Sequence, residues 1–171
     1  MQILVTVASR HGATAEIGTA IADVLRAEGH HVDEVAPEQV ADVTRYDAVV
    51  LGSAVYTAHW LPAARDLAAR FAGDLRRRPV WVFSSGLATQ PAARANSPHE
   101  LLALMRDIGA EGHRAFAGRL VRAELAFAER AIIAGARAKE GDHRDFTAVD
   151  AWARQIAADL RVGAPQHAAS A

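Results

Sequence analysis

The chain has 171 residues, a formal net charge of −1 and no cysteine. This length suits one domain with its own core, the near-neutral charge gives no indication of nucleic-acid binding, and the lack of cysteine excludes disulfides, thiolate metal sites and cysteine nucleophiles. No secretory leader pattern opens the chain and no apolar run reaches the ~20 residues of a membrane span, so we expect a cytoplasmic protein without a transmembrane segment.

The first chemically suggestive stretch is the polar turn Ser9-Arg10-His11-Gly12-Ala13-Thr14, between the apolar run 3–8 and a helical pattern from about Thr14 to Glu28. A helix start offers unpaired backbone N–H groups and the positive end of the peptide dipole, and Ser9 and Thr14 add hydroxyl donors. Gly12 permits a positive φ or a close backbone approach. The turn is therefore a candidate anion site, although turns of this kind also serve as plain connectors.

After this turn, short apolar runs alternate with amphipathic stretches. We expect four further strands, at residues 30–35, 48–52, 80–83 and 113–118. We expect a short helical connection at 37–45, a helix from Pro62 that closes at 76–79, a helix behind a capping box at 97–100, and a last helix from Thr147. The run 48–52 has no polar alternation, which is typical of a strand buried on both faces.

Strands that alternate with helices indicate an α/β fold with a parallel sheet and helices on both faces. Five strands at this spacing fit the doubly wound order 2-1-3-4-5, in which the loops after the first, third and fourth strands meet at the switch point. These loops are residues 9–14, 53–60 and 84–90. We assign one domain to residues 1–162 and expect a disordered tail over residues 163–171.

One segment exceeds what a simple strand-to-helix connection needs. Residues 119–140 show a helical pattern, and a polar turn at 141–145 follows it. The segment could act as a lid, as a helix on a membrane surface or as a helix that binds a partner, or it could pack across the sheet edge. Its mixed charge argues against the membrane alternative.

The turn Ser9–Thr14 resembles the phosphate loop of flavodoxin-like proteins, which bind FMN. The run Val49-Val50-Leu51-Gly52-Ser53-Ala54-Val55-Tyr56 with His59-Trp60 is similar to the flavodoxin-domain group that includes the bacterial HemG-type, quinone-dependent protoporphyrinogen dehydrogenases. The resemblance covers about residues 1–161 and includes an additional segment at 119–145. Competing α/β classes lack support, because there is no G-x-G-x-x-G turn, no Walker-type lysine and no G-x-S-x-G elbow.

The resemblance implies a flavodoxin-like FMN flavoprotein and names the residues that would bind the cofactor. These are Ser9, Arg10, His11, Gly12, Ala13, Thr14, Ser53, Ala54, Val55, Tyr56, Trp60, Ser85, Gly86 and Leu87. Residues 9–14 would hold the phosphate, with Arg10 either adding charge or pointing into solvent. Either Tyr56 or Trp60 would stack on the flavin ring, and backbone groups at 85–87 would bind its pyrimidine edge. The loop 84–90 has no aromatic residue, which would leave one face of the ring open.

Three further residues are candidates for chemistry beyond cofactor binding. His59 could donate a proton near the flavin or be an ordinary surface histidine. Arg119 and Arg122 could bind a substrate carboxylate, or be solvated helix residues. The histidines show no ligand spacing, so we expect no metal site.

The sequence therefore favours an FMN-dependent oxidoreductase, and the resemblance implies a link to a quinone and a porphyrinogen or another tetrapyrrole as substrate. The alternative is an electron-transfer flavodoxin that docks redox protein partners, although carriers of that kind are strongly acidic and this chain is not. A third hypothesis, an interaction module that has lost FMN, fits poorly with the intact Ser9, Gly12 and Thr14. The patterns do not indicate an oligomeric state.

Overall fold

The computed structural model describes residues 1–86, 99–121, 123, 125 and 140–163. Within this part of the chain, five parallel strands form the central sheet. They are β1 (Gln2–Ala8), β2 (His31–Glu34), β3 (Ala48–Tyr56), β5 (Val80–Gly86) and β6 (Gly112–Ala117). Their order is β2-β1-β3-β5-β6, which confirms the doubly wound arrangement predicted from the sequence.

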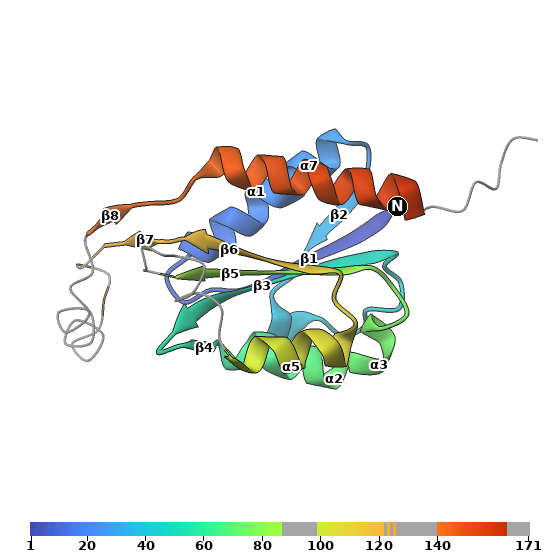
Figure 1. Ribbon diagram of the computed structural model, residues 1–171, viewed down its shortest axis with the longest axis horizontal. Helices are drawn as coiled ribbons and strands as arrows, with labels where there is room; N and C mark the ends of the chain where they lie inside the picture. The colour runs from blue at the N-terminus through green and yellow to red at the C-terminus, as the bar shows by residue number, and fades with distance from the viewer. Residues whose placement is uncertain (87–98, 122, 124, 126–139, 164–171) are drawn as a thin grey trace, which may run out of the picture.

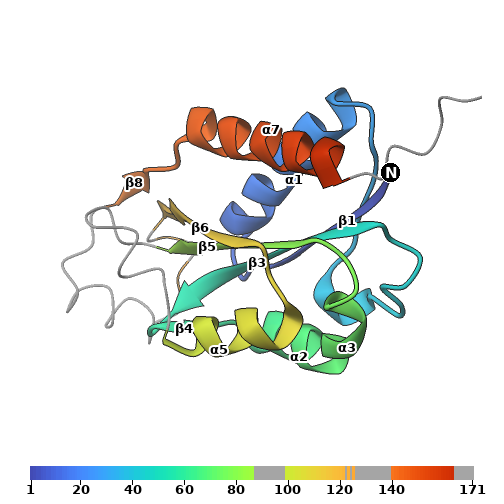
Figure 2. The same ribbon diagram turned by 45° about the vertical axis from the view of Figure 1, so that its right-hand side comes forward.

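Helices cover both faces of this sheet (Figure 1). α1 (Ala13–Ala27) and α7 (Phe146–Gly163) lie on one face, while α2 (Pro62–Arg70), the short α3 (Ala72–Leu75) and α5 (His99–Ile108) lie on the other (Figure 2). Two apolar clusters fill the space between the layers, one centred on Ile3, Ile17 and Phe83 and the other on Leu4, Leu51 and Leu67. Because both faces are covered, the central strand β3 is buried along most of its length.

The strand register brings three chain segments together at the carboxyl edge of the sheet. β1 pairs with β3 as far as Ala8 and Ser53, and β3 pairs with β5 as far as Ala54 and Ser85. β1 therefore ends beside the middle of β3, and the last residues of β3 and β5 project beyond it. The turn that follows β1 occupies this step in the edge.

The expected loop over residues 53–60 is wrong, because most of it is strand. β3 continues to Tyr56, and the chain then reverses through Thr57 and Ala58 into β4 (His59–Trp60), which pairs antiparallel with the end of β3. Both turn residues have positive φ, 46° and 63°, as a two-residue hairpin turn requires. Neither is glycine, asparagine or aspartate, so the usual sequence signal for this turn is missing. The expected helical connection at 37–45 is likewise reduced to one 3-10 turn, η1 (Pro37–Gln39).

The additional segment starts and ends as strand, which corrects the helical pattern at its start and the polar turn at its end. β7 (Arg119–Leu120) and β8 (Gly141–Asp142) form a small antiparallel pair in which Arg119 lies opposite Asp142. Residues 122, 124 and 126–139, the capping-box residues 97–98, Leu87 and the tail 164–171 lie outside the described residues. No helix in the described ranges is long and apolar enough to cross a membrane.

Candidate functional site

A pocket lies at the carboxyl edge of the sheet, where the turn after β1 meets the ends of β3 and β5. Its lining contains Ser9, Arg10, His11, Ala13 and Thr14 from the turn and the start of α1. Residues 54–56, 85 and 86 contribute the strand ends, and Gly118 closes it together with residues 119–121 and 125 of the additional segment. The pocket thus joins the three loops that the doubly wound order places at the switch point.

The start of α1 lines this pocket, and its backbone geometry suits an anion. Gly12 is the N-cap residue with φ 80° and ψ −26°, and the cap has no side-chain hydrogen bond. The carbonyl of Gly12 accepts the N–H of Glu16 at 2.9 Å, so the N–H groups of the preceding first-turn residues lack helical acceptors. Thr14, only 4% exposed, adds its hydroxyl beside them. These donors and the helix dipole suit a phosphate group.

The two aromatic candidates lie in different environments. Tyr56 is half-buried and lines the pocket, with the guanidinium of Arg10 4.7 Å from its ring centroid and the ring of His11 6.4 Å away. Trp60 is 1% exposed and belongs to the core between the sheet and α2. Its Nε1 donates to Ser84 Oγ at 2.8 Å. Of the two, the structure brings only Tyr56 into the pocket, because Tyr56 and Trp60 lie on opposite faces of the β3–β4 hairpin.

Ser53 and His59 also lie apart from the pocket lining. Ser53 is fully buried; its Oγ accepts the N–H of Leu61 at 2.9 Å and donates to the carbonyl of Ala54 at 2.8 Å, which braces the hairpin. The His59 side chain is 62% exposed and its Nδ1 lies 3.1 Å from Glu100 Oε2. Burial acts to raise the pKa of Glu100, but the hydrogen bonds from His59 and the Trp60 N–H outweigh it, and the net pKa is lowered. His59 thus anchors the hairpin to α5.

Sequence patterns did not predict a hydrogen-bonded group of buried side chains formed by Trp60, Ser84 and His113. Ser84 Oγ, which accepts the Trp60 indole N–H, also lies 2.9 Å from His113 Nε2. Burial lowers the pKa of His113 to about 4, so its imidazole is neutral at neutral pH. This group joins β4, β5 and β6 through side chains that lie 24 to 29 residues apart in sequence, which no local motif reveals.

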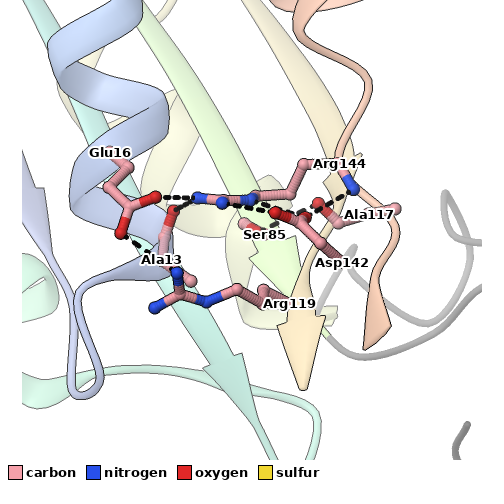
Figure 3. Close-up of polar contacts among 7 residues, drawn as sticks. All are labelled: Ala13, Glu16, Ser85, Ala117, Arg119, Asp142 and Arg144. Atoms are coloured by element: carbon pink, nitrogen blue, oxygen red, sulfur yellow. Dashed lines mark hydrogen bonds and ion pairs between the residues drawn. The ribbon is translucent and has the colours of Figure 1, made fainter. Parts of the chain in front are cut away.

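A cluster of ion pairs links the additional segment to α1 (Figure 3). Glu16 in the first turn of α1 contacts Arg119 at 3.4 Å and Arg144 at 2.6 Å. Arg144 also holds Asp142 through two hydrogen bonds of 2.8 and 2.6 Å. These hydrogen bonds from Arg144 lower the pKa of Asp142 to about 2, and the same partners raise the pKa of Arg144. Glu16, Asp142 and Arg144 were missed in the sequence because the contact that joins them, between Glu16 and Arg144, spans 128 residues.

Arg119 is the predicted substrate residue that the structure places in the pocket wall. Its guanidinium lies on the α1 side, where it contacts Glu16. Arg122 and Leu87 lie outside the described residues. The described residues contain no group of three or more histidine, aspartate or glutamate side chains arranged to hold a metal ion.

Solved structures with the same fold include flavodoxins and the flavodoxin-like part of larger oxidoreductases. A flavodoxin from the domain Archaea matches with a TM-score of 0.62 at 14% identity, covering 94% of this chain and 99% of that one. The flavodoxin of Streptococcus pneumoniae TIGR4 matches with a TM-score of 0.60 at 20% identity over 93% and 99%. Rubredoxin oxygen:oxidoreductase from Desulfovibrio gigas matches at 0.62 and 15% identity, and this chain spans 36% of its length and matches over 94% of its own. At these identities the matches show the fold.

No curated protein sequence matches the chain. The family model for the flavodoxin domain, however, matches residues 4–147, which include most of β1, the turn after it and the other four strands of the central sheet. Flavodoxin domains bind FMN, and the uncapped helix start at Gly12 and the half-buried Tyr56 fit its phosphate and its ring. The chain belongs to the flavodoxin domain family, and FMN is its cofactor.

Proposed function

We propose that this protein is an FMN-dependent oxidoreductase that exchanges electrons with a small molecule bound beside the flavin. The observation that carries the proposal is the pocket wall made by residues 118–121 and Leu125. A wall from the additional segment encloses more of the switch-point crevice than the strand-end loops alone. Such an enclosure favours the binding of a small molecule over the docking of a protein, which needs a flatter surface.

Within this proposal the turn after β1 holds the FMN phosphate. The N–H groups at the start of α1 and the hydroxyls of Ser9 and Thr14 donate to it, with Gly12 setting the turn. Tyr56 offers a face to the flavin ring. The guanidinium of Arg10 lies over the Tyr56 ring, so a flavin stacked on that face would displace it. Backbone groups of Ser85 and Gly86 lie at the same edge. When bound, FMN supplies one- or two-electron transfer, and the chain supplies binding, orientation and a dry environment.

The substrate class that we favour is a quinone or a tetrapyrrole. The resemblance of residues 49–60 to the HemG-type group supports it, and so does the chemistry of the wall. Leu120, Val121 and Leu125 present apolar surface, and Arg119 adds a cation that suits a carboxylate. Arg122 stays a candidate for the same role.

A second candidate function is electron transfer between protein partners. The flavodoxins from the archaeal source and from S. pneumoniae match this chain over 99% of their own lengths, so the fold of a small flavodoxin accounts for most of it. An electron carrier needs an exposed flavin edge rather than an enclosed substrate pocket. The two functions therefore differ in what the additional segment does.

The deciding experiment uses FMN-loaded protein that is photoreduced under anaerobic conditions with EDTA as the electron donor. The reduced protein is mixed with a soluble quinone, and in a parallel assay the oxidised protein is mixed with protoporphyrinogen. We expect at least one reaction to run faster than with the same concentration of free FMN. If neither exceeds free FMN while a flavodoxin reductase or a ferredoxin exchanges electrons readily, the protein is a carrier.

A further inference from the structure

The first turn of α1 carries a charge that opposes phosphate binding. Glu16 lies one helical turn after Gly12, close to the backbone donors proposed to hold the phosphate. A carboxylate in the first turn stabilises the helix through its dipole, but it repels a phosphate dianion at the same place. The site therefore works best where the charge of Glu16 is compensated.

Two arginines provide this compensation, and both come from the additional segment. Arg119 Nη1 lies 3.4 Å from Glu16 Oε1, and Arg144 Nη1 lies 2.6 Å from Glu16 Oε2. Each carboxylate oxygen thus faces its own guanidinium (Figure 3). The Arg144 side chain is only 4% exposed and the Glu16 side chain is 49% exposed, so solvent screens this ion pair from the Glu16 side.

Arg144 also fixes the position of the helix start. Its Nη1 donates to the carbonyl of Ala13 at 3.0 Å, the first residue of α1. Asp142 on β8 holds the other side of the guanidinium, and Asp142 lies opposite Arg119 in the β7–β8 pair. The register of two short strands therefore sets both arginines against one carboxylate.

We propose that Arg119, Asp142 and Arg144, here called the insertion base, form an electrostatic part of the FMN-phosphate site, with Arg144 as a positioning residue. The insertion base neutralises Glu16 and holds Ala13, so the affinity for the phosphate depends on residues more than 100 positions away in the chain. The inference rests on the proposed assignment of the phosphate to residues 9–14. It gives the ends of the additional segment a role separate from any contact with a substrate.

The test compares FMN with riboflavin, which lacks the phosphate. Dissociation constants of both are measured on the apoprotein by flavin fluorescence quenching, and their ratio reports the phosphate contribution. Arg144→Met leaves Glu16 and Asp142 facing each other without this cation. We expect the preference for FMN over riboflavin to fall about tenfold, a change of ~1.4 kcal/mol.

Arg161→Met is the matched control. Arg161 on α7 pairs at 2.8 Å with Glu28, the C-cap residue of α1, so it makes an arginine–glutamate ion pair at the opposite end of α1. We expect its ratio to stay within twofold of wild type. A double variant, Glu16→Gln with Arg144→Met, removes the repulsion and should recover most of the lost preference.

Each outcome is decisive. If Arg144→Met weakens the binding of FMN and riboflavin equally, or if the double variant recovers none of the lost preference, Arg144 has only a structural role and the inference is wrong. If Arg144→Met does not fold, Arg119→Met and Glu16→Gln decide, because the first should lower the ratio and the second should not.

Thr14→Ala in the same assay separates the two proposals. A ratio lowered by Thr14→Ala but not by the arginine variants overturns this inference alone, and a ratio unchanged in all of them also overturns the phosphate assignment.

Discussion

Tyr56 and Trp60 show how position in a hairpin separates two similar side chains. They are four residues apart, yet Tyr56 faces the pocket and Trp60 packs in the core with its indole N–H on Ser84. The β4 strand pairs Val55 with Trp60 and Tyr56 with His59, so the two aromatic residues fall on opposite faces of the pleat. Their substitutions should therefore have different consequences.

We expect one substitution to lower the FMN affinity and the other to lower the unfolding free energy. Tyr56→Ala should weaken FMN by about tenfold, because an aromatic face worth ~1.5 kcal/mol is lost, and change the unfolding free energy of the apoprotein little. Trp60→Phe should leave FMN affinity within a few-fold and lower that unfolding free energy by about 1–3 kcal/mol, because the polar group at Ser84 loses its donor. Urea unfolding and flavin titration measure the two effects. The reverse pattern would show that Trp60 is the stacking residue.

His113 makes stability depend on pH. Its pKa in the folded protein is about 4, lowered by burial from the ordinary 6.5, so the unfolded chain binds more protons than the folded one between these values. The contribution of His113 is fully present above pH ~6.5 and is lost as the pH falls toward 4.

The measurement is the unfolding free energy at a series of pH values for His113→Gln and wild type. The variant should lose less stability than wild type between pH 7 and 4.5, because it has no proton to take up. His31→Gln, at an exposed position on β2, serves as control and should follow the wild-type curve. Parallel curves for His113→Gln and wild type would show that this histidine is not the group responsible.

At the scale of elements, the β7–β8 pair separates the insertion base from the rest of the additional segment. Leu120 and Gly141 are paired, so an Asn-Gly turn can replace residues 121–140 and close a two-residue hairpin. This deletion keeps Arg119, Asp142 and Arg144 and removes Val121 and Leu125 from the pocket wall.

We expect the shortened protein to bind FMN within about threefold of wild type and to lose at least tenfold in turnover with the quinone or porphyrinogen that the wild type uses. The reason is that the phosphate site remains while the substrate wall is gone. Steady-state kinetics beside an FMN titration test both parts. Unchanged turnover would remove the additional segment from the substrate side and favour the carrier function.

At the scale of the whole molecule, the proposed phosphate site is a single turn, residues 9–14, in the described part of the pocket. Because the described part of the site has no second anion-binding turn for an adenylate group, the protein should bind FMN rather than FAD. Bound FMN should raise the melting temperature with concentration, since binding at 100 times the dissociation constant stabilises a fold by ~2.7 kcal/mol. Mass spectrometry of the released cofactor and thermal unfolding with FMN and FAD check this prediction. Finding FAD, or an equal shift with both, contradicts it.

The fold followed from local patterns along the chain. The apolar run 48–52, the helical stripe after Thr14 and the glycine at position 12 each report the immediate environment of the backbone, and the spacing of the strands left few topologies open. The turn from Ser9 to Thr14 was found for the same reason, since a strand end, a glycine and a helix start are adjacent in sequence. The polar and aromatic residues at the ends of the strands were only candidates at that stage.

The tertiary structure decided which candidates share the pocket. A shift of one residue in a strand reverses the face of a side chain, so the sequence could not separate Tyr56 from Trp60 or show that Ser53 braces a hairpin. It could not show that Arg144 meets Glu16 either, because that contact joins α1 to the residues before α7 across 128 positions. Local periodicity carries no information on such a pair; the order of the strands and the packing of α7 beside α1 bring it together.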